Sequence, residues 1–288
     1  MKYLLKLYPS TPLKTTCILL VIILFPSLLF AQLARERTVK DPEVEKTFFS
    51  TMNIGISTVE NVDKNNLKSS VKHTFGLVSS GVDQFFGLDN GANTKISLDY
   101  GITDRLSVGI GRMTFNKVVD IRSKFNVLNQ TESGSTPVSV ALKGTLGITT
   151  LSGLGYSFND RLSYFGSVMV ARKFDALSIQ LSPMITYFNR PFSGNEQTLA
   201  GLGLSGSYEL NDRYALSTEY LPVISNRNPG TQDAFAIGLN IDTGGHVFQL
   251  FLSSAQWHNE PFIMANNNDS FWEGDFRFGF NIHRVFGL

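Results

Sequence analysis

The chain has 288 residues, one cysteine and a formal net charge of +1 at pH 7. A charge this close to zero gives no argument for nucleic-acid binding, and we expect no nucleic-acid partner. The only cysteine is Cys17, near the beginning of the chain. A disulfide framework is therefore excluded for the remainder of the sequence.

Residues 1–31 have the layout of a secretory signal peptide. Lysines stand before an apolar run that extends from Cys17 to Phe30 and contains Pro26. This run is shorter than the roughly 20 residues of a membrane-spanning helix, so cleavage after Ala31 is preferred to a retained anchor. We therefore predict export from the cytoplasm.

Residues 32–66 are predicted to be an N-terminal extension that faces the periplasm, followed by one membrane domain over residues 67–288. Leu33–Lys46 is charged and contains a proline, which predicts a solvated tail. Phe48–Val59 is more apolar, and two interpretations stay open: a short strand, or a segment tucked into the mouth of the domain that follows. No later stretch is long and apolar enough for a membrane helix, so a membrane protein of this sequence has to cross with strands.

From residue 67 onward, apolar and polar side chains alternate with the period of a β-strand that has one apolar face. Near residue 96, for example, Ile96 and Leu98 fall on one face, and Lys95 and Ser97 fall on the other. About twelve strands result, with ten and fourteen as alternatives, and twelve is an even number as bacterial barrels prefer. The predicted strands cover residues 67–78, 93–102, 105–111, 117–130, 138–148, 161–172, 177–186, 202–210, 214–223, 235–243, 246–257 and 274–288.

The last of these strands, residues 274–288, places Phe276, Phe278 and Phe280 on one face. An aromatic-faced closing strand is typical of outer-membrane barrels, in which the last strand pairs with the first and the apolar face meets lipid. Alternation alone also fits a soluble sandwich. The export signal, the polar face rich in glycine and serine, and aromatic residues near the strand ends favour the barrel. We predict an all-β, transmembrane, antiparallel up-and-down β-barrel.

A short repeat occurs at Tyr100–Ser107, Tyr156–Ser163 and Tyr208–Ala215, each with Thr or Asn before an Asp-Arg pair. This is a turn signal, because such side chains bond to their own backbone. Twelve strands put Asp104 and Asp212 at the periplasmic end but Asp160 at the opposite end. Either the hairpin at Asp160 differs from the other two, or the strand count between residues 137 and 172 is wrong.

Five stretches together resemble the membrane-bound β-barrel family catalogued as domain of unknown function 5777. They are residues 73–112, RLSYFGSVMVARKF (161–174), LSIQLSPMITYFNR (177–190), IDTGGHVFQLFLSSAQ (241–256) and GDFRFGFNIHRVF (274–286). The resemblance implies a barrel in the outer membrane of a diderm bacterium, and it implies no activity. Outer-membrane lipid is then an expected partner, and so is the barrel-assembly machinery acting on the C-terminal strand.

Charged side chains of both signs fall on the polar face that would line the lumen. If they pair across the lumen, the barrel is closed and structural. If water separates them, the barrel is a narrow and weakly selective pore. The candidate lumen-lining residues are Lys95, Asp99, Arg105, Lys143, Glu209, Glu219, Asp242 and Arg277.

Three residues, His246, Gln249 and His283, are candidates for the barrel rim or for a ligand contact. His246 ends the Thr-Gly-Gly-His sequence 243–246, where a tight hairpin is preferred to a proton-responsive or ligand-binding histidine. Gln249 is predicted to face inward, and His283 to line the lumen or the rim. No nucleophile elbow and no metal-ligand spacing is found, so we expect no catalytic residue, no metal and no cofactor.

Three functions follow, in order of preference. The first is a narrow passive channel or facilitator for small solutes in the outer membrane. The alternative is a closed structural or surface-interaction barrel that acts through outer loops at 189–198, 225–231 and 258–269. The third is a lipid-modifying enzyme, which an outward-facing Ser and His pair at the membrane rim would support.

Overall fold

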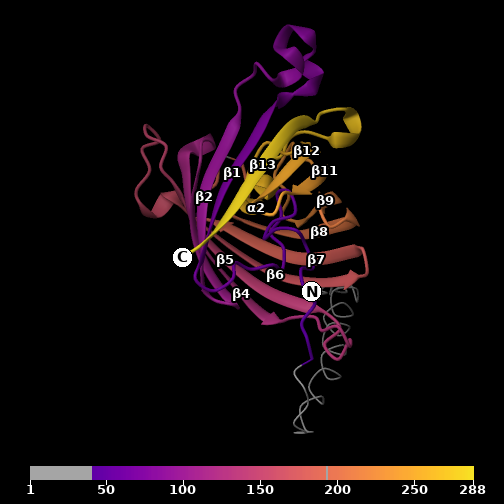
Figure 1. Ribbon diagram of the computed structural model, residues 1–288. Coiled ribbons are helices and arrows are strands. Elements are labelled where there is room, and N and C mark those ends of the chain that lie inside the picture. Colours follow the sequence, from indigo (N-terminus) through magenta and orange to yellow (C-terminus); the bar gives the residue numbers. More distant parts are fainter. Residues whose placement is uncertain (1–40, 193) are drawn as a thin grey trace, which may run out of the picture. The chain divides into compact units, whose positions relative to one another are not determined.

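In the part of the chain that the structure describes, thirteen strands, all paired antiparallel, form a single closed sheet (Figure 1). The computed structural model describes residues 41–192 and 194–288, so the predicted signal peptide and residues 32–40 lie outside the described part. The strands are β1 (Asn66–Leu77), β2 (Asn93–Thr103), β3 (Leu106–Met113), β4 (Val118–Leu128), β5 (Ser139–Thr149), β6 (Leu162–Phe174), β7 (Leu177–Phe188), β8 (Thr198–Asn211), β9 (Tyr214–Leu221), β10 (Val223–Ser225), β11 (Ala234–Asp242), β12 (His246–Ser253) and β13 (Arg277–Gly287).

The barrel closes between the first and the last strand. β13 pairs with β1 in a register that begins at Asn66 opposite Gly287. β10 is a short continuation of β9 beyond Pro222, and it pairs with β8 as β9 does. β9 and β10 therefore occupy one place in the wall. The wall has twelve strands, which confirms the prediction.

The connections differ between the two ends of the barrel. At one end, here called the turn side, most connections are short: 104–105, 175–176, 212–213 and 243–245, with 129–138 longer. Residues 66 and 287, where the wall begins and ends, also lie there. The other end, here called the loop side, carries the connections 78–92, 114–117, 150–161, 189–197, 226–233 and 254–276.

The three copies of the repeat around Asp104, Asp160 and Asp212 lie at different ends of the barrel. On the turn side, Thr103 Oγ1 accepts a hydrogen bond from the backbone N–H of Leu106 at 3.0 Å, and Asn211 Oδ1 accepts one from Tyr214 at 3.1 Å. The third copy lies on the loop side. There Asp160 accepts hydrogen bonds from the N–H and hydroxyl of Ser157 and sits in a 3-10 turn, not in a tight hairpin. The strand count was right, and the hairpin at Asp160 is the one that differs.

The outward face is apolar along the strands. Ile96, Ile110, Ile179 and Ile185 are each about half exposed or more. Contiguous apolar surface of this kind is rare on soluble monomers and fits contact with lipid. No helix in the described part of the chain is long and apolar enough to cross a membrane.

Helices are few and lie in the connections. The α-helix α2 (Glu260–Asn266) belongs to the loop-side connection 254–276, which we call the α2 loop. The β1–β2 hairpin projects beyond the rest of the loop side, and Phe85 and Phe86 are exposed at its tip (Figure 1). The 3-10 turns are η2 (Val78–Ser80), η3 (Val82–Gly87), η4 (Phe115–Lys117), η5 (Asn159–Arg161) and η6 (Phe271–Glu273).

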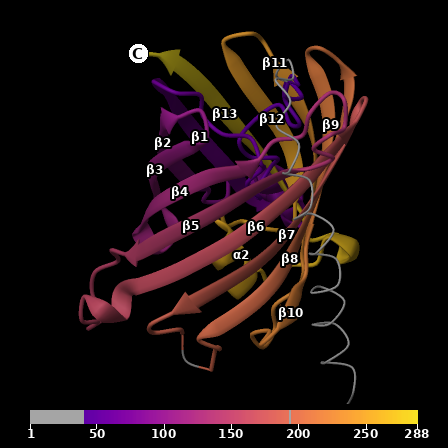
Figure 2. The ribbon, with the colours of Figure 1, turned by 90° about the horizontal axis from the view of Figure 1, so that it is seen from below.

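The lumen is occupied by the chain itself. Residues 47–62, here called the plug segment, run inside the ring of strands before β1 begins (Figure 2). Phe48, Ile54, Ile56 and Val59 of this segment are at most 4% exposed. Of the two interpretations of Phe48–Val59, the structure has the tucked-in segment, although Met52 and Ser57 do form one isolated antiparallel bridge.

Candidate functional site

One carboxylate of the wall holds the middle of the plug segment. Glu219, on β9, accepts backbone N–H hydrogen bonds from Ile54 and Gly55 at 2.7 Å each, and from Ile56 at 2.9 Å. Glu219 is only 5% exposed, so these charge-assisted bonds replace the water that the carboxylate would otherwise have. A charge buried without such donors would be strongly unfavourable.

Wall amides satisfy other backbone groups of the plug segment. Gln180 Oε1 accepts from the N–H of Val59 at 2.8 Å, and its Nε2 donates to the carbonyl of Ser57 at 2.8 Å. Asn281 Nδ2 donates to the carbonyl of Ile54 at 3.0 Å. Side chains of the wall therefore do for this segment what a neighbouring strand does in a sheet, because a buried backbone group needs a partner.

Lysines hold the opposite side of the plug segment. Lys124 Nζ donates to the carbonyls of Thr51 at 3.4 Å, Thr58 at 3.1 Å and, more closely, Glu60. Lys68 Nζ donates to the hydroxyl of Ser50 at 3.2 Å. Neither lysine belongs to an ion pair within the described residues.

The α2 loop brings a second carboxylate into the lumen. Glu260 Oε1 lies 2.6 Å from Lys143 Nζ and accepts a hydrogen bond from the hydroxyl of Ser57 at 2.9 Å. Burial by itself raises the pKa of Glu260, but the charge of Lys143 and its hydrogen bond outweigh burial, so the pKa falls to about 2. Phe262 and Met264 of the same helix are also buried. Lys143, Ser57 and Glu260 thus join wall, plug segment and α2.

His258 stands at the entry to the same helix. Its Nε2 lies 2.9 Å from the carbonyl oxygen of Asn93, and the ring is 4% exposed. Burial and the nearby charge of Lys72 lower the pKa of His258 to about 3. The imidazole is therefore neutral and serves as a hydrogen-bond donor to the wall.

A polar cavity, here called the charged cavity, remains between the plug segment and strands β1–β5. Its empty space, including solvent at its opening, is about 630 Å³. Cations outnumber carboxylates along it by five to three, since Lys72, Lys95, Arg122, Lys124 and Lys143 face Asp99, Asp120 and Glu260.

Each carboxylate of this cavity lies within ion-pair distance of a cation, whereas Lys72 and Lys124 have no carboxylate partner within the described residues. Asp120 lies 2.6 Å from both Lys95 and Arg122, and Arg122 is 2.7 Å from Asp99. Lys72 is 2% exposed, and its Nζ donates a hydrogen bond to the carbonyl of His258 at 3.4 Å. No ion pair of the described residues includes Lys72.

The wall opposite the cations is lined by small residues. A Cβ atom at Gly203 would lie 3.2 Å from Ile56 Cδ1, and one at Gly201 would lie 2.9 Å from Met264 Cε. Ser182, on the next strand, is fully buried beside them. This wall makes room for the plug segment and α2, because larger side chains would occupy their place.

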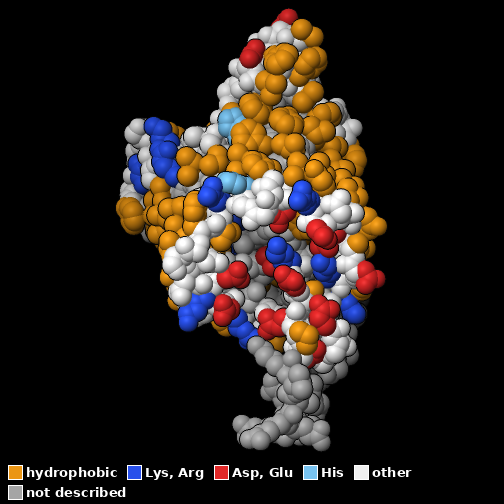
Figure 3. Space-filling view, viewed as in Figure 1, with side chains coloured by type: hydrophobic (Ala, Val, Ile, Leu, Met, Phe, Trp, Pro, Cys, Tyr) orange, Lys and Arg blue, Asp and Glu red, His pale blue; other side chains and the backbone are white. Residues whose placement is uncertain are grey.

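Acidic and basic side chains also gather around a hollow in the lower half of the face that Figure 3 shows, below strands covered by hydrophobic side chains. Two of the charged contacts at the turn-side end of the wall are Lys173 with Glu209 at 2.7 Å and Lys46 with Asp242 at 3.8 Å. These pairs are partly exposed, unlike those of the lumen.

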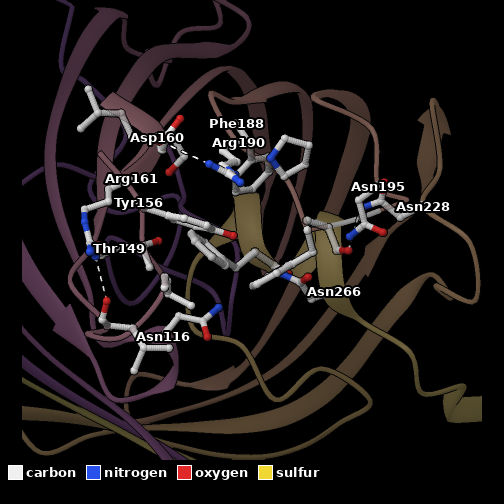
Figure 4. Close-up of a pocket in the computed structure, with 18 of the residues that line it drawn as sticks. Asn116, Thr149, Tyr156, Asp160, Arg161, Phe188, Arg190, Asn195, Asn228 and Asn266 are labelled. Carbon is white, nitrogen blue, oxygen red and sulfur yellow. Dashed lines mark hydrogen bonds and ion pairs between the residues drawn. The ribbon is translucent and has the colours of Figure 1, made fainter. Parts of the chain in front are cut away.

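A further cavity of about 560 Å³ opens on the loop side (Figure 4). Arg190 stacks over the ring of Tyr156 at 4.6 Å and lies 3.5 Å from Asp160. Phe262 and Asn266 of α2 form part of its lining. The stretch 258–266 therefore contributes to both cavities, with residues 258–260 lining the charged cavity and residues 262, 265 and 266 lining this one.

The sequence-predicted residues fall at three levels of the barrel. Lys95, Asp99 and Lys143 line the charged cavity. Glu219 holds the plug segment, whereas Glu209 and Asp242 lie near the turn-side ends of their strands. Arg277 is buried at the loop side, where its Nη1 donates to the carbonyl of Ser254 at 2.6 Å and its Nη2 to Asp269 at 2.6 Å.

The rim candidates separate. His246 lies on the outward phase of β12 at the turn side, with its Nε2 3.2 Å from Arg284 Nη1. Gln249 and His283 are buried inside: His283 Nε2 lies 3.0 Å from Gln249 Oε1, and its Nδ1 lies 2.8 Å from the hydroxyl of Ser70. Gln249 Nε2 in turn donates to the carbonyl of Met52 at 3.2 Å.

Two expectations need correction. Arg105 does not line the lumen: it lies in the β2–β3 turn, is about half exposed and stands 3.8 Å from Glu43. It follows a turn residue, so the alternation that sets inward and outward faces no longer applies to it. The stretch 258–269 was expected to be an outer loop, but residues 258–265 are buried, because they fold into the barrel around α2.

Sequence reasoning missed several cations and carboxylates of the lumen. Lys68 and Lys72 on β1, and Asp120, Arg122 and Lys124 on β4, have the inward phase of their strands. The same alternation that identified Lys95 and Asp99 was available to find them. No comparable signal in the sequence identified Glu260, because this residue lies in a connection where side chains do not alternate between two faces.

A closed antiparallel barrel with an apolar exterior and a polar lumen filled by its own chain is the class that this fold defines. The chain belongs to the family described as the membrane bound beta barrel domain (DUF5777), whose model matches residues 48–286. The matched range begins at Phe48, so it includes nearly the whole plug segment.

Several solved structures are distantly similar. The NanC porin is 10% identical over 77% of this chain and 99% of its own, with a TM-score of 0.48. The KdgM porin is 9% identical with the same coverage and TM-score. Omp33 of Acinetobacter baumannii is 8% identical over 78% of this chain and 100% of its own, with a TM-score of 0.41. Among curated proteins, none matches the sequence.

Proposed function

We propose that the protein is an outer-membrane channel for small solutes, held closed by the plug segment and α2 in the conformation described above. The observation that carries this proposal is the charged cavity beside the plug segment. Lys72, Lys95 and Arg122 face it from the wall, and Lys72 has no carboxylate partner within the described residues, whereas a barrel closed by ion pairs would pair its lumen charges. Buried charges of this kind are weak contributors to stability, since their desolvation offsets much of their attraction. A role in a water-filled passage accounts for their presence.

The contacts of the plug segment support reversible closure. Glu219, Gln180 and Lys124 bind it through hydrogen bonds to its backbone, which water can replace when the segment leaves. Each such bond contributes about 0.5–1.5 kcal/mol net, and those to charged groups about 1.5–3 kcal/mol. The segment is thus held firmly and without a covalent link.

Conductance of the refolded protein in a planar bilayer tests the channel. We expect the unmodified protein to be mostly closed, with brief openings. Glu219→Gln removes one charged acceptor of the plug segment, so we expect roughly tenfold longer open times. Glu209→Gln is the matched control, because Glu209 lies on the neighbouring strand but pairs with Lys173 outside the plug contacts.

A specific result would overturn the proposal. If Glu219→Gln inserts as a folded barrel, its plug segment becomes accessible to a thiol reagent through an introduced cysteine, and the bilayer remains silent, the lumen is not a channel. Retained heat-dependent mobility on a denaturing gel establishes that the variant barrel is folded.

The second candidate is a closed structural or surface-interaction barrel. The observation that favours it is the filling of the lumen, together with the pairing of Asp99, Asp120 and Glu260 with cations. In that case the loop-side cavity, bordered by Asn195 and Asn228 of the loops predicted to bind a partner, is the functional surface. A silent, unplugged barrel is the result that would favour this candidate.

We propose a non-catalytic role. Ser70 and His283 are hydrogen-bonded, but both are at most 3% exposed and face the lumen instead of the membrane rim. Replacing Ser70 with alanine tests this: a loss of lipid hydrolysis by the purified protein would contradict it.

The proposed location is the outer membrane, reached through the signal peptide, with lipid on the apolar face and the barrel-assembly machinery acting on β13. Separation of inner and outer membranes by density, followed by detection of the protein, is the measurement. Recovery in the inner-membrane fraction would contradict this location.

A further inference from the structure

We propose that the lumen contains a binding site for small organic anions, carboxylates first, and that Glu260 fills this site from within the chain. The proposal rests on the proposed function for its role in passage, but the site itself is argued from the lumen alone. Glu260 presents one carboxylate oxygen to Lys143 at 2.6 Å and to the Ser57 hydroxyl at 2.9 Å. A free carboxylate offers the same acceptor to the same donors.

Glu260 differs from the other carboxylates of the cavity in its origin. Asp99 and Asp120 project from strands of the wall, so their positions are fixed by the sheet. Glu260 stands at the first residue of a seven-residue helix in a loop of the barrel. A short helix in a connection is displaced at much lower free energy than a strand in a closed sheet. The Lys143 ammonium is thus the cation whose partner can leave.

Lys72 makes the site larger than one pair. It lines the same cavity as Lys143, is 2% exposed and has no carboxylate within ion-pair distance in the described part of the chain. A buried ammonium without a counter-charge is strongly unfavourable unless a partner arrives. Displacement of Glu260 would leave Lys72 and Lys143 facing one cavity, which suits a ligand with two carboxylates.

The charge of the wall favours anions along the whole lumen, not only at Lys72 and Lys143. Strands β1–β5 direct six cations inward against two carboxylates. The cations are Lys68, Lys72, Lys95, Arg122, Lys124 and Lys143, and the carboxylates are Asp99 and Asp120. Rings or rows of lysine and arginine select anions in pores. With the plug segment displaced, we expect anions to pass in preference to cations.

Malonate binding to the full-length mature protein in detergent tests the site without any need for conduction. The chain has two tryptophans, Trp257 and Trp272. Trp272→Phe leaves Trp257 as the reporter, because its ring stacks on Phe262 of α2 at 5.4 Å and its Nε1 donates to Asn266. We expect malonate to shift the Trp257 emission to longer wavelength as α2 is displaced.

Three variants sharpen the binding test. Glu260→Gln removes the competing carboxylate, so we expect roughly tenfold tighter malonate binding. Lys72→Gln should weaken binding roughly tenfold. The double variant Lys143→Gln/Glu260→Gln leaves the net charge of the lumen unchanged and should not show the tighter malonate binding expected of Glu260→Gln alone. Malonamide, which has the same shape without charge, is the control ligand and should produce no shift.

The current test separates this inference from the proposed function. In a Glu219→Gln barrel under a tenfold gradient of potassium chloride, we expect a reversal potential that corresponds to at least a roughly threefold preference for chloride. A conducting barrel that prefers cations, and does not bind malonate, overturns the inference and leaves the channel standing. Malonate binding by a barrel that never conducts supports the site and overturns the channel. Equal malonate affinity of the Glu260→Gln and unmodified proteins also overturns the inference.

Discussion

The two halves of the barrel wall share one exterior and have opposite interiors. Strands β1–β5 and β6–β12 both present alternating apolar side chains outward, because both face the same apolar surroundings. Inward, the first half carries most of the lumen cations, and the second half carries many glycine, serine and alanine residues. Lys124 of the first half holds the plug segment through charge-assisted hydrogen bonds to its backbone. Small residues of the second half, such as Gly203, leave space for the segment, and Glu219 is the charged residue of this half that binds its backbone.

This difference shows how one strand pattern supports two tasks. The outward phase is constrained by the membrane in every strand, whereas the inward phase is free to vary with what the lumen contains. A cysteine introduced at Ile56 measures the balance between the halves, because Ile56 is 1% exposed in the plug segment and the predicted mature chain contains no other cysteine. Its labelling rate by a membrane-impermeant maleimide reports how often the segment leaves.

The largest expected effect is that of Glu219→Gln, which weakens the one charged side chain of β6–β12 that holds the plug segment in the described part of the chain. Loss of charge on an acceptor of three N–H groups should destabilise the bound segment by about 3 kcal/mol. Labelling at Ile56→Cys should then rise roughly 100-fold, since each 1.4 kcal/mol is a factor of ten. An unchanged labelling rate would mean that the other contacts hold the segment without Glu219.

Lys124→Met should have the second-largest effect, because it removes the hydrogen bonds by which β4 holds the backbone of the plug segment. Three backbone carbonyls lose their donor, at about 2 kcal/mol in total, and labelling should rise roughly 30-fold. Lys117→Met is the matched control, since Lys117 is exposed at the loop side of the same region. Comparable labelling in both variants would contradict the role given to Lys124.

Gly203→Leu should have a moderate effect, because the larger side chain takes up space that the plug segment occupies beside strand β8. The added side chain meets Met184 and Ile56, and overpacking of this kind costs about 1–3 kcal/mol. Labelling should rise roughly tenfold. Gly144→Leu, where an added Cβ meets no atom within 4 Å, should leave labelling unchanged. If both variants leave the rate unchanged, the small residues do not create the space.

Arg105→Gln should have the smallest effect. Its pair with Glu43 spans 3.8 Å between partly exposed side chains, and such pairs contribute about 0.5 kcal/mol or less. Labelling and conductance should stay within twofold of the unmodified protein. A larger change would mean that Arg105 acts on the lumen after all.

Much of the wall was predictable because its signals are local. Strand alternation predicted the inward phase of Lys95, Asp99, Lys143 and Glu219, and the count of twelve strands was right. The conflict at Asp160 disappeared once this residue proved to lie in a loop-side 3-10 turn. Arg105 was misplaced, since a turn interrupts the period on which the assignment depended.

By itself, the sequence determined which strands exist, which of their faces is apolar and that a barrel is their closed form, because a period of two fixes the facing of each side chain from its neighbours. Only the tertiary structure decided what fills the lumen. Glu219 lies 165 residues from Ile54, and Glu260 lies 117 from Lys143. Such contacts depend on closure of the whole sheet, which brings distant polar groups together in a space where each must find a partner.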